Sequence, residues 1–396
     1  GREPHEVRLA NLVPPEAMPF DNIAGKHFDS GDYPECLRRA VAAIDVAGVR
    51  ARQKTGEEDG RLIGIGLAIF SEQAAHGTAV YAAWGIPMIP GHEQAAARLT
   101  PDGDLELKVG VHSHGQGLET ALAQIAHEVL GIDPGQVEVV HGDTDLTPYS
   151  TGTWGSRCIV MAGGAAAAAC TELSRRAVRI GAHLLQADPA EVAVAAGRVV
   201  AAAGSVSLAD VARAWYLTPQ DLPETVDTGG LEVTAGYKPV RDDGTFSYAA
   251  HAAVVAVDPE LGAVEILDYV VVEDGGVMIN PMIVDGQVLG GAAQGIGTAL
   301  YEEMPFDDEG QPLASTLADY MLPGAAEVPD IRILHMETPS PYTVFGQKGI
   351  GEGGAIGPLG ALANAVNDAL HPLGAWLGET PITPRRVLAA IREAGS

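Results

Sequence analysis

Apolar residues recur along this chain at two spacings, one typical of helices and one typical of strands. The first sixty residues carry an amphipathic helical pattern over 34–52, whose apolar face consists of Leu37, Val41, Ile44 and Ala47. From Leu62 the chain changes to glycine-rich, strand-like runs at 63–70, 95–100 and 105–111. A turn at Asp102–Gly103 separates the last two runs, so we expect the three strands to form one antiparallel sheet.

A similar order of elements then comes twice. The first sheet is followed by a helical pattern, a short strand and an alanine-rich helix, at 117–130, 137–141 and 161–187. The second round consists of a sheet, a helix, a glycine-rich stretch and a further helix, at 247–272, 286–303, 346–360 and 361–370. This order predicts an α+β fold of two similar units, each a mixed or antiparallel sheet with packed helices.

We therefore divide the chain into three parts. Residues 1–60 form a connecting helical region, 61–235 form the first α+β unit, and 236–396 form the second. The chain begins at Gly1, without a starting Met and without the basic and apolar segments of a signal peptide. We interpret it as a piece of a longer protein, in which the connecting region is the tail of an upstream half.

Charge and composition narrow the class of partner. Acidic residues outnumber basic ones by 52 to 24, which gives a net charge of −28 and argues against nucleic acid as a partner. Apolar residues make up 46% of the chain but form no run long enough to cross a bilayer, so we expect a soluble protein. The three cysteines form no C-x-x-C pair, so we expect neither a disulfide scaffold nor a thiolate metal site. This cysteine content predicts a cytoplasmic location.

The strongest chemical signal is one carboxylate, Glu352, inside the glycine-rich run 346–357. Without Cβ atoms, the backbone of such a run can approach a bulky anionic cofactor and present its N–H groups to it. A surface turn is the simpler interpretation of a glycine-rich loop taken alone. The run lacks the lysine and hydroxyl of a phosphate-binding loop and the context of a dinucleotide fold, so a nucleotide site is poorly supported.

A second signal is Gln116 between two glycines, Gly115 and Gly117, at the junction from a strand to a helix. A glutamine there offers a donor and an acceptor beside the free N–H groups of a helix N-terminus. His112 and His114 alternate along the preceding strand and so share one face. No third ligand stands at a convincing spacing, which favours ordinary strand histidines over a metal site.

A third signal is the polar loop from His141 to Arg157, which ends at the alanine-rich helix. Thr153, Ser156 and Arg157 supply donors where a phosphate or a pterin ring is favoured. Alternatively, Ser156 simply caps that helix.

Taken in order, these segments resemble the xanthine dehydrogenase and aldehyde oxidase family of molybdenum hydroxylases, and most of all the large subunit of aerobic carbon monoxide dehydrogenase. The resemblance spans nearly the whole chain and rests on 115–117, 142–145, 152–157, 274–281 and 348–352. It implies a molybdenum ion held by the dithiolene of a molybdopterin cofactor, with no protein ligand to the metal, and leaves open whether the cofactor is its cytosine dinucleotide form. Glu352 is then the catalytic base, acting on a hydroxyl ligand of the metal, and water supplies the oxygen. The implied cofactor contacts are Gly115, Gln116, Gly117, Thr153, Trp154, Gly155, Ser156, Arg157, Lys348, Gly349, Ile350 and Gly351.

The resemblance covers only the C-terminal half of the family's molybdenum subunit. It implies that the upstream half is a separate chain or a cleaved segment, and that partner subunits carry 2Fe–2S clusters and FAD. We expect a dimer of such hetero-oligomers. The reaction is hydroxylation of an aldehyde or an N-heterocyclic carbon, with two alternatives: carbon monoxide oxidation by the same site, or a non-catalytic assembly subunit. The residues that shape the substrate pocket are expected in the loops 86–94 and 340–345, which do not name a substrate.

Overall fold

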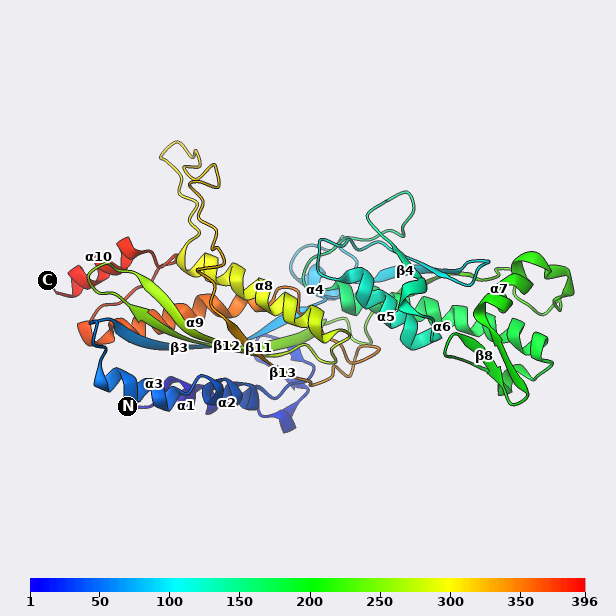
Figure 1. The fold of residues 1–396 in the computed structure, drawn as a ribbon, viewed down its shortest axis with the longest axis horizontal. Helices are drawn as coiled ribbons and strands as arrows, with labels where there is room; N and C mark the ends of the chain where they lie inside the picture. The colour runs from blue at the N-terminus through cyan, green and yellow to red at the C-terminus, as the bar shows by residue number, and fades with distance from the viewer. Residues whose placement is uncertain (396) are drawn as a thin grey trace.

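The computed structural model describes residues 1–395 as an elongated molecule of two bodies arranged along its long axis (Figure 1). The body at one end contains a four-stranded sheet with the strand order β10-β4-β5-β6, and the body at the other end contains one with the order β13-β12-β11-β3. The chain therefore folds around two main sheets, as the two-unit prediction requires.

The first repeat runs through two strands, a helix, a strand and a long helix, which are β4 (Glu93–Leu99), β5 (Leu105–Val109), α5 (Leu118–Leu130), β6 (Val137–Val140) and α6 (Cys158–Leu185). Strands β4 and β5 are antiparallel and are joined through the predicted turn, whereas β6 is parallel to β5. A fourth strand, β10 (Glu232–Tyr237), lies antiparallel to β4 at the other edge. Between α6 and β10 the chain forms a small layer of β7 (Ala193–Ala195), β8 (Arg198–Ala201), β9 (Gly204–Ser207) and α7 (Leu208–Leu217).

The second repeat has the same order, in β11 (Thr245–Val257), β12 (Val264–Asp274), α8 (Pro281–Leu300), β13 (Ile331–Met336) and α9 (Gly353–Leu370). Again the first two strands are antiparallel and the third is parallel to the second. The fourth strand is β3 (Leu62–Ala74), which lies antiparallel to β11. The two repeats match in strand order and strand direction, which confirms the two similar α+β units. Helices α4 (Thr78–Ala83) and α10 (Pro384–Ala394) lie outside the repeats.

The prediction that residues 63–70 pair with the strands at 95–111 is wrong, because β3 belongs to the sheet of the second repeat. The reason lies in its glycines. A Cβ atom at Gly64 or Gly66 would lie 1.9 Å from a backbone carbonyl oxygen of α9, so this strand packs against that helix without side chains between them. The expected boundary at residue 61 therefore does not separate the sheets; the other domain limits stay a prediction.

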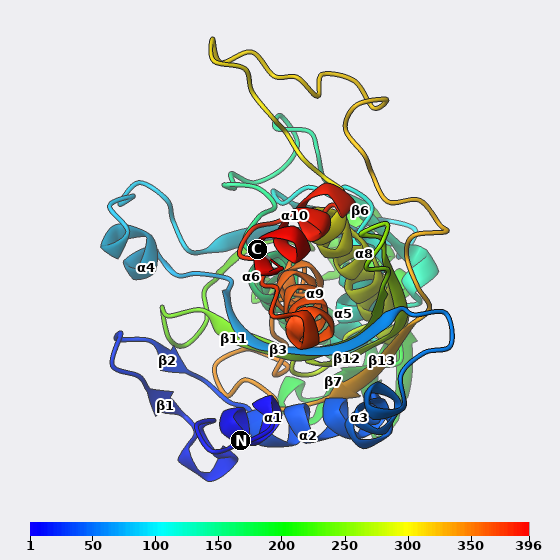
Figure 2. The same cartoon turned by 90° about the vertical axis from the view of Figure 1, so that its left-hand side faces the viewer.

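Helices from the N-terminal region cover the second sheet on the face opposite α9, as Figure 2 shows. They are α1 (Pro4–Leu9), α2 (Tyr33–Ala43) and α3 (Val46–Thr55), with a small hairpin of β1 (Phe20–Asp21) and β2 (His27–Phe28). The single helix predicted over 34–52 is thus wrong. Asp45 takes a left-handed conformation with φ of 53° and caps α3 through the N–H of Gly48, which divides the pattern into two helices.

Two further helices begin earlier than the apolar pattern indicated. Helix α8 starts at Pro281, because Asn280 accepts a hydrogen bond from the N–H of Ile283 and proline suits the first turn. Helix α9 starts at Gly353 and includes Pro358, so Glu352 stands directly at its N-terminus. Short 3₁₀ helices occur at Pro15–Ala17, Pro134–Gln136, Pro189–Glu191, Pro219–Asp221 and His371–Leu373.

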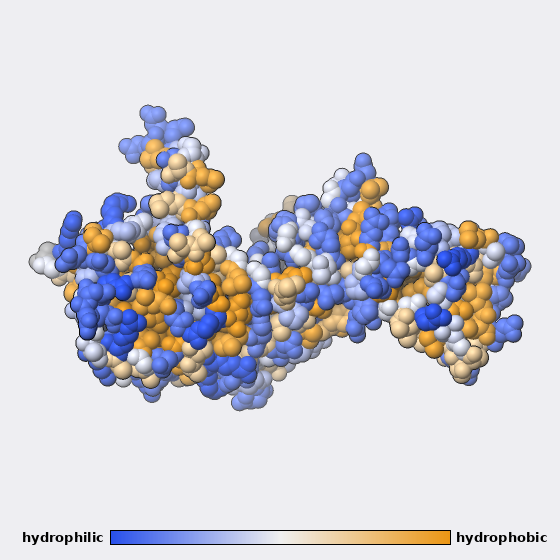
Figure 3. All heavy atoms as spheres, viewed as in Figure 1, coloured by the Kyte–Doolittle hydropathy of each residue, from blue (hydrophilic) through white to orange (hydrophobic). Residues whose placement is uncertain are grey.

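Between α8 and β13, residues 302–330 form an arm that projects from the second repeat (Figures 1 and 2). Several of its large apolar side chains are mostly exposed, namely Phe306, Leu313, Leu317, Met321 and Leu322. Figure 3 shows apolar patches along the arm, among polar side chains. Within residues 1–395, no helix combines the length and the apolar character needed to cross a membrane.

Candidate active site

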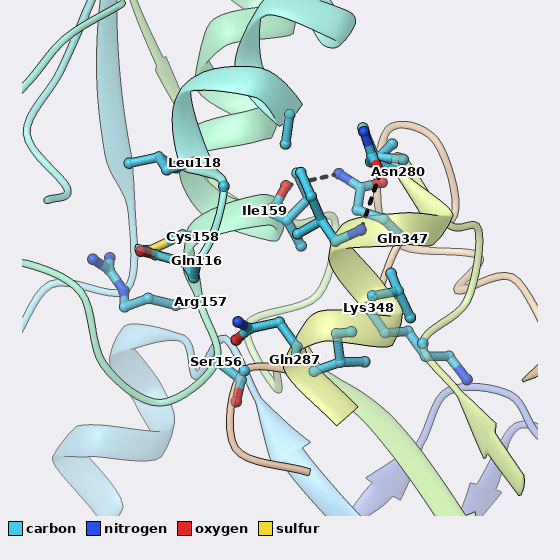
Figure 4. A pocket seen from close by; sticks show the side chains of 18 of the residues that line it. Gln116, Leu118, Ser156, Arg157, Cys158, Ile159, Asn280, Gln287, Gln347 and Lys348 are labelled. Atoms are coloured by element: carbon cyan, nitrogen blue, oxygen red, sulfur yellow. Dashed lines mark hydrogen bonds between the residues drawn. The ribbon is translucent and has the colours of Figure 1, made fainter. Parts of the chain in front are cut away.

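A cavity of about 400 Å³ lies where the two repeats meet (Figure 4). Four loops line it: those after β5 and β6 in the first repeat, and those after β12 and β13 in the second. Each loop leads into a helix, so the N-termini of α5, α6, α8 and α9 converge on the same cavity. In both repeats the strands that precede these loops are parallel neighbours, which places the loops at one edge of each sheet.

Glu352 stands at the junction of the two repeats. Its Oε1 atom accepts a hydrogen bond from the N–H of Gly155, at 2.9 Å, and its own N–H donates to the hydroxyl of Ser156, at 3.0 Å. Both partners belong to the first repeat, 196 or more positions earlier in the chain. The predicted base is therefore held by the loop of the other unit, and its side chain remains exposed toward the cavity.

A second carboxyl, Glu72, lies behind this contact and was not predicted. Its Oε1 atom accepts a hydrogen bond from the hydroxyl of Ser156, at 2.5 Å, and Glu72 is only 8% exposed. Burial raises the pKa of Glu72 to about 7; the nearby Glu352 carboxylate raises it too, while the hydrogen bonds from Ser156 and Ser247 lower it. The sequence offers no local signal for this residue, because its partners lie far along the chain.

Arg157 does not direct its charge into the cavity. Its side chain is fully buried and pairs with Glu93, the first residue of β4, while further N–H groups donate to the carbonyl oxygens of Gly152 and His92. Figure 4 shows the guanidinium turned away from the cavity. Arg157 thus anchors the loop in front of α6. Any contact between Arg157 and a ligand in the cavity would be made by its backbone.

Lys348 has a comparable place in the second repeat. Its buried ammonium group donates to Asp274 and to the hydroxyl of Thr338, both at 3.2 Å, and lies over the ring of Tyr248. In Figure 4 its end points away from the cavity. Both basic residues predicted as cofactor contacts are therefore anchors of their loops, each paired with a buried carboxylate.

The remaining predicted residues lie at the cavity or one residue away from it. The lining includes Gln116, Gly117, Thr153, Trp154, Ser156, Ile350 and Gly351, whereas Gly115, Gly155 and Gly349 are just outside it. The Gln116 side-chain amide forms hydrogen bonds within its own loop: it accepts from the N–H of His114 and donates to the carbonyl oxygen of His112.

Two further predictions about the site are wrong or unsupported by the lining of the cavity. Ser156 does not cap α6, because Arg157 occupies the N-cap position and no side chain caps the helix. The expected substrate loops, 86–94 and 340–345, do not line this cavity.

The loop after β12 contributes more of the lining than the sequence suggested. Together with the first turn of α8, this loop forms an apolar wall, which consists of Val277, Met278, Ile279, Ile283 and Val284. Asn280 joins the repeats, since its side-chain amide donates to Gln124 of α5 at 2.8 Å. Gln347 does the same from the other loop, by donating to the carbonyl oxygen of Ile159 at 3.2 Å. The Asn280-Pro281 pair was the sequence signal that could have located this wall, because it marks a helix start.

The cavity fits a bulky anionic ligand that brings its own metal ligands. Three of the four converging helices, α5, α6 and α9, begin without a side-chain cap, so N–H groups of their first turns remain for a ligand. Within residues 1–395 there is no group of three or more His, Cys, Asp or Glu side chains that could hold a metal ion. His112 and His114 accordingly gain no third ligand. A metal in this cavity would depend on a cofactor for its coordination.

Comparison with known proteins agrees with this geometry. A family model described as a molybdopterin cofactor-binding domain matches residues 39–329. The chain is 36% identical over 392 residues to the nicotine 6-hydroxylase large subunit of Paenarthrobacter nicotinovorans, covering 98% of this chain and 47% of that protein. It is 33% identical over 396 residues to the carbon monoxide dehydrogenase large chain of Hydrogenophaga pseudoflava, covering 98% and 48%.

Solved structures show the same fold. The quinoline 2-oxidoreductase structure from Pseudomonas putida 86 matches with a TM-score of 0.92 and 38% identity, over 99% of this chain and 50% of that one. A Cu,Mo-containing carbon monoxide dehydrogenase matches with a TM-score of 0.90 and 30% identity, again over 99% and 50%. The chain thus spans about half the length of the relatives that it matches.

Proposed function

Since the chain belongs to the molybdopterin cofactor-binding family of molybdenum hydroxylase large subunits, we propose that it is the part of such a subunit that carries the catalytic base. The observation that carries this proposal is Glu352, a carboxylate at the mouth of a cavity that two repeats build together. The reaction is hydroxylation of a substrate carbon with water as the source of oxygen. The alternative of a non-catalytic assembly subunit does not explain why this carboxylate is held so specifically.

The cofactor of the proposed site is molybdopterin with molybdenum, either as such or as the cytosine dinucleotide. When bound, it supplies the metal centre that takes up the electrons of the substrate. The loops 115–117, 153–157 and 348–351 would hold it, mainly through backbone N–H groups at the starts of α5, α6 and α9. Buried anchors behind these loops, Arg157–Glu93 and Lys348–Asp274, keep the N–H groups in place before the ligand arrives.

Glu352 is suited to accept a proton at its second carboxylate oxygen. The N–H of Gly155 binds Oε1, and within residues 1–395 no donor occupies Oε2. Oε1 thus orients the side chain, while Oε2 is free to accept the proton of the hydroxyl group that reacts with the substrate. The carboxylate stands directly at the N-terminus of α9 and belongs to the lining of the cavity.

Two features support partner chains. The chain spans about half the length of its relatives, whose names describe large subunits or chains, and its projecting arm exposes apolar side chains that an isolated surface rarely carries. We propose that the rest of the large subunit completes the cavity and covers the arm. An iron–sulfur subunit and an FAD subunit receive the electrons, because the three cysteines of this chain, at 36, 158 and 170, are scattered. The whole assembly is doubled by a two-fold axis.

For the substrate, we favour an N-heterocyclic carbon. Relatives named for nicotine and quinoline share 36% and 38% identity with the chain, against 33% and 30% for carbon monoxide dehydrogenases. The apolar wall formed by Val277, Met278 and Ile279 offers a surface on which a flat ring can pack. Carbon monoxide oxidation by the same base is the second candidate, supported by the 0.90 TM-score to a carbon monoxide dehydrogenase.

The first experiment is metal and pterin analysis of the natively purified complex, with mass spectrometry of every chain that co-purifies. We expect stoichiometric molybdenum, a chain that supplies the upstream half, and an iron–sulfur subunit. In the same complex, Glu352→Gln should lower turnover by at least about 100-fold while molybdenum stays bound, because a general base contributes about 10²–10⁴-fold. The matched control is Glu58→Gln, at an exposed carboxylate outside the cavity.

Two results would refute the proposal. One is a complete, folded complex that contains no molybdenum or pterin after growth with ample molybdate, which would favour the assembly role. The other is a Glu352→Gln complex that contains molybdenum and turns over as fast as the control.

A further inference from the structure

Beside the catalytic carboxylate lies a second, buried one that the proposed reaction does not use. Glu72 is near the end of β3, where Oε1 accepts from the Ser156 hydroxyl at 2.5 Å and Oε2 accepts from the Ser247 hydroxyl at 3.4 Å. Within residues 1–395 it has no cationic partner. A buried carboxyl without a cation is expensive to keep, so packing alone gives no reason for it.

Ser156 connects this carboxyl to the catalytic one. Its hydroxyl donates to Glu72 and accepts from the N–H of Glu352, so one atom touches both residues. Ser156 takes a left-handed conformation with φ of 51°, which is rare for a residue with a side chain and persists only where its surroundings impose it. A Cβ atom at Gly349 would lie 1.7 Å from the Ser156 carbonyl oxygen, so the 348–351 loop wraps closely around this serine.

The end of β3 also holds the other partner of Glu352. The N–H of Ala75 donates to the carbonyl oxygen of Gly155, at 2.9 Å, and the N–H of Gly155 donates to Glu352. The end of β3 and Ala75, the residue directly after it, therefore hold the 155–156 turn at two points, through the Glu72 side chain and the Ala75 backbone. Because that turn makes both hydrogen bonds to Glu352, the strand determines where the catalytic carboxylate stands.

We propose that Glu72 is a positioning residue for Glu352, which it reaches through Ser156, and that its charge sets the lower pH limit of the reaction. This inference rests on the proposed function, in which Glu352 is the base. The groups that face Glu72 are the neutral hydroxyls of Ser247 from β11 and Ser156 from the 155–156 turn, and the carboxylate of Glu352 from the start of α9. Glu352 is thus the charged group with which Glu72 interacts.

Protonation of Glu72 consequently changes its hold on Ser156. The ionised carboxylate accepts a charge-assisted hydrogen bond from the Ser156 hydroxyl, and the neutral carboxyl accepts a weaker one. Burial, the first cause, and Glu352 together place the pKa of Glu72 at about 7, so Glu72 changes its charge near neutral pH. A neutral residue at position 72 therefore mimics the protonated form of Glu72, with its weaker hold on Ser156, at every pH.

The test uses the complete, cofactor-loaded complex and three variants. Glu72→Gln keeps the shape and the acceptor oxygen but removes the charge; we expect kcat well above pH 7 to fall by about 10-fold and the change in rate near pH 7 to disappear. Ser156→Ala removes the connecting hydroxyl, and kcat should fall by about 10-fold at unchanged molybdenum content, a loss typical of groups that orient an active residue. Glu138→Gln, at an exposed carboxyl on β6, should leave the profile unchanged.

A second readout does not depend on turnover. In infrared difference spectra recorded across pH, the wild-type complex should show a carboxyl that titrates near pH 7, and Glu72→Gln should lack it. The inference is overturned if the Glu72→Gln complex keeps that titration and the wild-type rate profile. If instead the complex contains no molybdenum, or Glu352→Gln turns over normally, the proposed function fails, and the infrared titration still decides whether Glu72 carries the buried proton.

Discussion

The two repeats have the same strand order, yet they bury their sheets differently. In the first, β4 and β5 alternate between buried and partly exposed residues, because α5 and α6 pack on one face only. In the second, every residue of β11 is buried, since α8 and α9 cover one face and α1 to α3 cover the other. Glu352, the proposed base, comes from the loop of the doubly covered repeat, and the singly covered repeat supplies Gly155 and Ser156, which hold it. In the proposed function, one copy of the repeat thus supplies the reacting group and the other positions it.

The largest effect is expected from breaking the loop anchors, one in each repeat. Lys348→Met leaves Asp274 buried without its cation, and Arg157→Met does the same to Glu93; each should lower stability by about 3–5 kcal/mol. Calorimetric unfolding of the complex measures this. Adding Asp274→Asn to Lys348→Met should restore part of the loss, because no unpaired charge then remains, although the asparagine NH2 group cannot accept the hydrogen bonds that one carboxylate oxygen accepted. A Lys348→Met complex as stable as the wild type would show that the buried pair does not anchor its loop.

A smaller effect is expected from the close contact between strand β3 and the long helix α9 of the second repeat. In Gly66→Ala the new Cβ atom would lie 1.9 Å from the carbonyl oxygen of Ala361, and such overpacking costs about 1–3 kcal/mol. Gly290→Ala, in helix α8, meets nothing within 4 Å and should be neutral or stabilising by up to about 1 kcal/mol. Equal melting temperatures for the two variants would contradict the packing of β3 on α9.

The smallest effect concerns pH and a histidine of the second repeat. His335 lies between Glu273 and Asp285, at 2.9 and 2.8 Å. The hydrogen bond to Glu273, above all, raises the pKa of His335 to about 9, and Asp285 adds to this while partial burial opposes it. A raised pKa means that the charged form stabilises the fold: the contribution is complete below about pH 6.5, the unfolded value, and is lost as pH rises through about 9.

His335→Gln should therefore lower stability at pH 6.5 and have little effect at pH 10. We expect the free energy of unfolding to fall by only about 1 kcal/mol at pH 6.5, because Asp285 is half exposed and water screens its interaction with His335. Thermal unfolding of both proteins at the two pH values measures the difference. If the variant loses the same stability at pH 10 as at pH 6.5, the histidine acts through packing and not through its charge.

Local patterns predicted the parts of the site that depend on nearby residues. The glycine run placed Glu352 before a helix, and the strand-to-helix junction placed Gln116 at the start of α5. Periodicity found most helices, since an apolar face repeats within a few turns. It missed the break at Asp45, because apolar spacing continues across it and only a left-handed backbone angle divides the two helices.

By itself, then, the sequence determined the two repeats, the loop that carries the proposed base and the family to which the motifs belong, because each depends on residues that are neighbours along the chain. Only the tertiary structure decided that β3 completes the second sheet, that Glu72 stands behind Glu352, and that Arg157 and Lys348 turn their charges inward. These outcomes depend on contacts across 60 to 200 positions, as the separations of 64, 74 and 197 residues in the site show. Packing and desolvation in the folded chain decide which strand pairs with the edge of a sheet and which carboxylate pairs with a buried cation. No local sequence pattern predicts these choices.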